Sequence, residues 1–133
     1  MSYKNDFKNC LDGLFESLCD VSDWMYENPE LGFEEFKTSK YLVDYIQKNS
    51  KSVNYPSHGL ETAFDITFGE EGPLTVICVE YDALPEIGHA CGHNIIATAS
   101  IGAGLSLKDI ASKLGIRVKL LGTPAEEGGG GKI

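Results

Sequence analysis

Apolar residues recur along the first fifty positions with the spacing of amphipathic helices. Between residues 7 and 25 they fall at positions 7, 11, 14, 15, 18, 21 and 25, which is the pattern of a helix with one buried face. Asn28-Pro29 ends this helix, because a residue before proline is disfavoured in the helical region. A second helix is predicted from about residue 35 to residue 48. Its inner face carries Leu42, Tyr45 and Ile46.

Two apolar runs in the middle of the chain have the length and composition of β-strands. Residues 63–68 alternate between apolar and polar side chains. Residues 74–79 are almost continuously apolar, which predicts burial on both faces, as in the centre of an α/β sheet. A helix is predicted from about residue 94 to residue 114, with Asn94 as its N-cap and Gly115 as its stop. Residues 116–121 form the last predicted strand.

The order of elements over residues 74–121 is strand, loop, helix, strand, which is that of a βαβ unit with parallel strands. The predicted fold class is therefore α/β, with a mainly parallel mixed sheet flanked by helices. Ligands of such sheets bind at the carboxyl ends of the strands. The loops at residues 80–93 and 122–133 both follow strand ends, so we expect them to meet at one edge of the sheet.

Composition and charge exclude several classes of function. The 133 residues form at most one ordinary domain. The net charge is −9, and the 11 lysines and arginines form no cluster, which argues against nucleic acid or an anionic membrane surface as a partner. No apolar run is long enough to span a bilayer, and the first residues lack the apolar core of a signal peptide. We therefore expect a cytoplasmic protein whose cysteines are reduced.

The first of the two loops ends in Gly88-His89-Ala90-Cys91-Gly92-His93-Asn94. Cys91 and His93 are two residues apart, so in an extended backbone their side chains project to the same side. Thiolate and imidazole are ligands that zinc and similar ions prefer, so we predict a metal site here. His89 is interpreted as a hydrogen-bonded loop histidine, and Asp82 either orients a ligand histidine or caps a turn.

The second loop contains adjacent carboxylates, Glu126 and Glu127, between Pro124 and a run of glycines. Neighbouring side chains diverge, so one carboxylate can bind a metal ion while the other faces the water that the ion activates. A metal-dependent hydrolase needs this combination of a Lewis acid and a general base.

Several motifs together resemble the M20 metallopeptidase and amidohydrolase family, in particular its aminoacylase-like branch. The segments that carry the resemblance are Asn28-Pro29-Glu30-Leu31-Gly32-Phe33-Glu34-Glu35, Tyr81-Asp82-Ala83-Leu84-Pro85, Gly88 to Asn94, and Gly122 to Lys132. The resemblance covers nearly the whole chain and implies part of a three-layer sandwich with two divalent ions, zinc or manganese, at the end of its sheet.

The resemblance also implies a role for each residue of the site. Cys91, His93 and Glu127 would be metal ligands, with Cys91 the bridge between two ions, and Glu126 would be the general base. The implied reaction is cleavage of the amide bond of an N-acyl amino acid or a dipeptide by metal-activated water. Other branches of the family have a ligand histidine at the position of Glu80, so this chain follows the cysteine-type arrangement. The intact form would be a homodimer.

The chain departs from the family in its length and in its few histidines. Three ligands cannot hold two ions, because a catalytic zinc normally has about three protein ligands by itself. We therefore expect residues 1–133 to be the N-terminal portion of the catalytic domain, without the lid or dimerisation domain and the C-terminal half. Such a piece would have little activity and an unpaired sheet edge.

Two other interpretations of the sequence remain open at this point. The chain is a non-catalytic metal-binding or interaction module, or it is a thiol enzyme in which Cys91 is the nucleophile and His89 or His93 the base.

Overall fold

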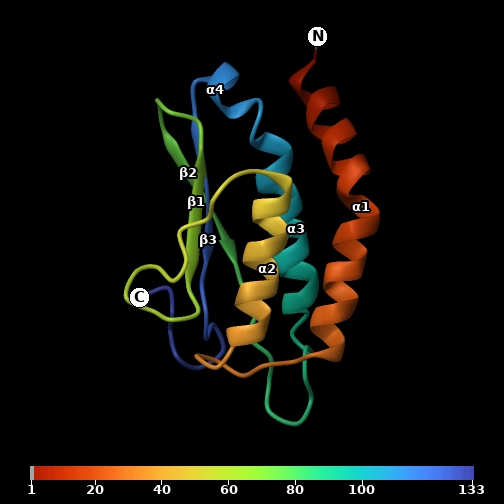
Figure 1. The fold of residues 1–133 in the computed structure, drawn as a ribbon, viewed down its shortest axis with the longest axis vertical. Helices are drawn as coiled ribbons and strands as arrows, with labels where there is room; N and C mark the ends of the chain where they lie inside the picture. The colour runs from red at the N-terminus through yellow and green to blue at the C-terminus, as the bar shows by residue number, and fades with distance from the viewer. Residues whose placement is uncertain (1) are drawn as a thin grey trace.

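The computed structural model describes residues 2–133, and Met1 lies outside this range. The elements in chain order are α1 (Tyr3–Glu27), α2 (Phe36–Asn49), β1 (Phe64–Phe68), β2 (Leu74–Val79), α3 (His93–Leu107), α4 (Ala111–Leu114) and β3 (Arg117–Gly122). The helices α2 and α3 lie along one face of the sheet, and α1 packs against α3 on the side away from the strands (Figure 1). None of the helices within residues 2–133 combines the length and apolar character that crossing a membrane requires.

The sheet has three strands in the order β1-β3-β2. Strands β2 and β3 are parallel, with Leu74 opposite Arg117, whereas β1 runs antiparallel to β3, with Phe64 opposite Gly122. The predicted α/β class and the parallel βαβ unit are therefore confirmed. Of the expected sandwich, residues 2–133 form the sheet and the helices on one of its faces.

The prediction that the strand at residues 74–79 is central was wrong. Strand β3 has neighbours on both sides, whereas β2 pairs along one side only within the described residues. Leu74 and Val76 are 42% and 45% exposed, and only Val79 at the end of the strand is fully buried. An apolar run shows that a strand can be buried, but it does not show which strands lie beside it. Here β1 pairs with β3 on the side opposite β2, so β3 is the central strand.

The predicted helix at residues 94–114 is interrupted after Leu107 and resumes at Ala111. Its N-cap is Gly92, in the left-handed conformation, and not Asn94. The Asn94 side-chain amide instead donates to the Ser22 hydroxyl 3.0 Å away, which joins α3 to α1. Gly115 does end α4 in the left-handed conformation, as predicted.

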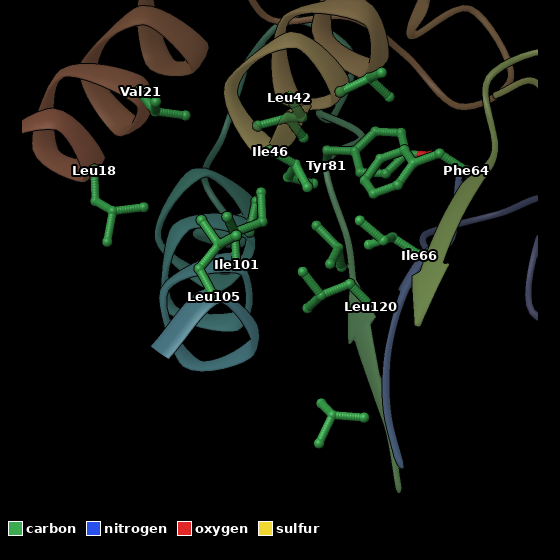
Figure 2. Close-up of a cluster of buried hydrophobic side chains, with 14 of the residues drawn as sticks. Leu18, Val21, Leu42, Ile46, Phe64, Ile66, Tyr81, Ile101, Leu105 and Leu120 are labelled. Atoms are coloured by element: carbon green, nitrogen blue, oxygen red, sulfur yellow. The ribbon is translucent and has the colours of Figure 1, made fainter. Parts of the chain in front are cut away.

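The core lies between the helices and the inner face of the sheet (Figure 2). It contains Leu18, Val21, Leu42, Ile46, Phe64, Ile66, Tyr81, Ile101, Leu105 and Leu120. The Tyr81 ring stacks on that of Phe64 with centroids 5.7 Å apart, and its hydroxyl donates to the carbonyl of Thr62 at 2.6 Å. Because Tyr81 directly precedes Asp82, the core fixes the start of the loop that follows β2.

Replacing Leu120, which is fully buried on the central strand, tests this arrangement. We expect Leu120→Ala to lower the free energy of unfolding by about 2–5 kcal/mol, because it removes buried surface and leaves a cavity. Val76→Ala on the exposed part of β2 is the matched control and should cost less than about 1 kcal/mol. Urea denaturation measures both changes. Equal losses would contradict the assignment of β3 as the central strand.

Candidate metal centre

His93 is the first residue of α3, and its side chain is buried, with 3% of it exposed. Its Nδ1 lies 2.7 Å from the carbonyl oxygen of Asp82 and 3.1 Å from the Asp82 carboxylate. A carbonyl oxygen can only accept, so Nδ1 carries a proton. The other ring nitrogen, Nε2, faces the second loop.

Three carboxylates surround His93 Nε2. The nearest oxygens of Glu80, Glu126 and Glu127 lie 3.5, 3.7 and 3.6 Å from it. These distances are long for hydrogen bonds. They are close to the spacing of two ligands of one ion, because ligand atoms at bond lengths of about 2.1 Å and tetrahedral angles lie about 3.4 Å apart. Ligand atoms of Glu80, His93 and Glu126 all lie within 4.8 Å of one another, so this donor set fits a divalent ion.

Asp82 connects the two loops that form the centre. While one side of its carboxylate faces His93, Oδ2 accepts a hydrogen bond from the backbone N–H of Glu127 at 3.0 Å. Of the two interpretations of Asp82, orientation of a histidine is the one that fits this geometry. The expectation that the loops after β2 and β3 meet at one edge of the sheet is confirmed.

Glu35 also supports the loop after β3, and it is one of the residues whose role the sequence did not reveal. It is fully buried, and it accepts hydrogen bonds from the Ala125 backbone N–H at 2.8 Å and from the Thr62 hydroxyl at 3.0 Å. Ala125 has a φ of 53°, a left-handed conformation that is unfavourable for alanine. The contact with Glu35 thus holds the turn that directs Glu126 and Glu127. Its place in the family-like motif from Asn28 to Glu35 was the one feature of the sequence that could have pointed to this role.

Cys91 is exposed and lies beside Glu127, whose carboxylate raises the pKa of the thiol. Gly92 has a φ of 80°, so the backbone between Cys91 and His93 is a turn and not the extended segment that we predicted. The Cys91 sulfur is not among the converging ligand atoms of Glu80, His93 and Glu126. A raised pKa disfavours the thiolate, which weakens the interpretation of Cys91 as the nucleophile of a thiol enzyme.

His89 is a loop histidine, as predicted, and it is buried. Neither ring nitrogen makes a well-formed hydrogen bond within residues 2–133, and only the backbone of Met25 lies near enough to favour its protonated form. Burial, followed by the proximity of His93, lowers the pKa of its ring. His89 is therefore a neutral side chain packed behind the centre.

Lys132 is the cation nearest to the carboxylates. Its ammonium forms an ion pair with Glu80 and lies 3.7 Å from an oxygen of Glu126. The pairing with Glu80 raises the pKa of Lys132, so the side chain stays charged. Sequence reasoning gave neither Lys132 nor Glu80 a function.

The fold and this centre define the class of protein, which is an α/β domain with a candidate divalent-cation site at the carboxyl ends of parallel strands. The sequence is 36% identical over 137 residues to an Xaa-Arg dipeptidase of Mus musculus, a match that covers 92% of this chain and 32% of the dipeptidase. It is 31% identical over 132 residues to a p-aminobenzoyl-glutamate hydrolase chain of Escherichia coli, a match that covers 85% of this chain and 27% of the hydrolase chain. No family model matches the sequence.

Solved structures of similar fold include a member of the M20 family. A dinuclear metal-binding peptidase of the M20 family from Bacillus subtilis superposes with a TM-score of 0.74 at 26% identity, over 87% of this chain and 36% of that one. A second structure, described as an aminohydrolase of Staphylococcus aureus, shares the fold with a TM-score of 0.76 at 22% identity, over 92% of this chain and 35% of that one. The resemblance to the M20 family is confirmed, and this chain is a homologue of its peptidases and amidohydrolases. It spans about a third of the length of the curated relatives it matches.

The buried Glu35 makes stability depend on pH in a direction that can be measured. Burial raises the pKa of Glu35 from its ordinary value of 4.5, so the folded state binds a proton more tightly than the unfolded state. The stabilisation that this proton provides is complete below the unfolded pKa and is lost as pH rises through the folded pKa. In Glu35→Gln the side-chain oxygen still accepts from Ala125, and the titration is absent. The stability of this variant relative to the native chain should therefore rise as pH increases from 4.5.

Urea denaturation at a series of pH values measures this difference. Glu34→Gln, at the exposed neighbouring position, is the control and should follow the native chain. A difference between Glu35→Gln and the native chain that does not change with pH would contradict the prediction.

Proposed function

We propose that this chain supplies part of the active site of a metal-dependent hydrolase that cleaves the C–N bond of a dipeptide or an N-acyl amino acid. The observation that carries the proposal is the convergence of His93 Nε2 with the carboxylates of Glu126 and Glu127. The similarity to a dipeptidase and to an aminobenzoyl-glutamate hydrolase supports the class of bond.

Each residue has a function in this proposal that follows from its position. His93, Glu127 and Cys91 hold the divalent ion, zinc or manganese, and Asp82 keeps the His93 ring oriented. When bound, the ion supplies a Lewis acid that polarises the amide carbonyl and acidifies a water molecule. Glu126 is partly exposed and not bonded to the backbone, so its carboxylate can turn toward the substrate and take up the proton of that water. The same side chain then delivers the proton to the leaving nitrogen.

A cleft beside Glu127 suits the apolar part of a small substrate. Its volume is about 520 Å³, and it borders both Asp82 and Glu127. This volume is within the usual range for small-molecule sites, about 300–1,000 Å³. The remainder of its lining is mainly apolar and includes Leu31, Phe33, Leu84, Pro85 and Ala125. An acyl chain or amino-acid side chain in this cleft would bring its amide bond to the carboxylates.

Residues 1–133 by themselves should be a poor catalyst. Two ions require about six protein ligands, and the centre described here offers fewer. In this proposal, the remaining ligands and the lid or dimerisation domain come from residues outside residues 1–133, and the whole protein acts as a cytoplasmic homodimer.

A titration with Co²⁺ tests the metal centre without depending on turnover. Co²⁺ replaces zinc in proteins and absorbs strongly in the near ultraviolet when a thiolate binds it. We expect the native chain to bind Co²⁺ with this absorption. Cys91→Ser should lose the absorption, and His93→Ala should bind at least about tenfold more weakly. Cys19→Ser, at an exposed thiol on α1, is the matched control. Co²⁺ binding that is unchanged in both Cys91→Ser and His93→Ala would exclude the proposed centre.

A hydrolysis assay with dipeptides and N-acyl amino acids tests the reaction. Any turnover should require added Zn²⁺ or Mn²⁺ and should stop when a chelator is added. Glu126→Gln should lower the rate by about 10²–10⁴-fold, because it removes the general base. Ion binding without any turnover, in the chain and in a longer protein that contains it, would favour the non-catalytic metal-binding module. Turnover that a chelator leaves intact but alkylation of Cys91 abolishes would favour the thiol enzyme.

A further inference from the structure

Glu80 occupies a position at the centre that the proposed function does not use. It follows the last residue of β2 and precedes the buried Tyr81, so its backbone is fixed between the sheet and the core. Its side chain is 17% exposed and points toward His93, with Oε2 3.5 Å from Nε2. The distance equals, within a few tenths of an ångström, those from Nε2 to Glu126 and to Glu127.

We propose that Glu80 is an additional ligand of the divalent ion, contributed from the end of β2. This inference rests on the proposed function, because it concerns the same centre. Ligand atoms of Glu80, His93 and Glu126 already lie within 4.8 Å of one another. The second observation is the His93 ring, which is 3% exposed and points Nε2 into this group, while Nδ1 is held by the Asp82 carbonyl. An acidic cluster alone attracts any cation, but a buried imidazole nitrogen that faces carboxylates is a ligand type suited to a metal ion.

Lys132 contacts the same carboxylates and supplies an alternative positive charge for them. Its ammonium pairs with Glu80 and lies 3.7 Å from Glu126, so it supplies part of the positive charge that the cluster needs. An ammonium has three donors and no lone pair, so Lys132 cannot itself bind the metal. It therefore competes with the ion for the Glu80 carboxylate. Lys132 is partly exposed and can swing away when the ion binds.

A simpler alternative is that Glu80 serves only as the ion-pair partner of Lys132. The two alternatives differ in whether the Glu80 carboxylate must reach the ion itself. A ligand must place an oxygen at bonding distance from the ion, so shortening the side chain by one methylene weakens binding even though the charge is kept. A carboxylate that only contributes negative charge tolerates the same shortening. Glu80→Asp therefore separates a ligand from a neighbouring charge.

The experiment measures Co²⁺ affinity by calorimetry and by visible absorption for the native chain and for Glu80→Gln, Glu80→Asp and Lys132→Met. Both Glu80 variants should bind at least about tenfold more weakly and show shifted visible bands, while the near-ultraviolet absorption of the Cys91 thiolate persists. Lys132→Met should bind more tightly than the native chain, because the competing cation is gone. Glu71→Gln, which removes an exposed carboxylate before β2, is the control for net charge and should match the native chain. Circular dichroism of the metal-free variants checks that each is folded.

The other outcomes distinguish the inference from the function on which it rests. Native-like affinity and bands in both Glu80 variants would overturn the inference and leave the proposed function intact. Weakening in Glu80→Gln alone, with full affinity in Glu80→Asp, would show an effect of charge and also overturn it. Weaker binding in Lys132→Met would exclude competition by Lys132. A native chain that binds no Co²⁺ would overturn the proposed function itself.

Discussion

The contacts of the Asp82 carboxylate hold the metal centre together. Asp82 is 2% exposed, and its two oxygens face different segments, His93 at the start of α3 and the Glu127 backbone N–H in the loop after β3. A buried carboxylate is costly unless charges and hydrogen bonds compensate it. Here it receives one backbone hydrogen bond, and its Oδ1 has no hydrogen-bond partner within residues 2–133. Such a group gains further compensation when a cation binds to the ring that it orients.

Support for Asp82 comes from the core and from the N-terminal half of the chain. Tyr81 anchors the preceding residue by stacking on Phe64 and by donating to the Thr62 carbonyl. The hydroxyl of the same Thr62 donates to Glu35, which in turn accepts from the backbone of Ala125. The loops after β2 and β3 are thus joined twice. One connection is direct, from Asp82 to the Glu127 backbone, and the other runs from Tyr81 through Thr62 and Glu35 to Ala125. Positions of the ligands therefore depend on contacts that span 90 residues of sequence.

The sequence was informative where structure follows from local spacing, and it failed where a residue has its partner on a distant segment. The periodicity of residues 7–25 predicted α1 within a few residues, and the parallel order of the βαβ unit placed the two loops at one edge. Sheet neighbours follow no local rule, so β2 was wrongly predicted to be central. Glu35 stands at the start of the helix predicted at residues 35–48, and nothing in its local spacing indicated that its side chain is buried. Glu80 and Lys132 are 52 residues apart, and only the folded chain shows that they pair.

The charges of the centre also explain why a thiol and a set of carboxylates occur side by side. Glu127, Glu126 and Asp82 all raise the pKa of the Cys91 thiol, so the acidic surroundings keep its proton in place. A nucleophilic cysteine requires the opposite environment, in which a nearby cation favours the thiolate. In the proposed centre a divalent ion would change this balance, because the thiolate would bind it and its charge would compensate the same carboxylates. The arrangement is thus unfavourable for a thiol nucleophile and consistent with a metal ligand, with the ion taking the place of the proton.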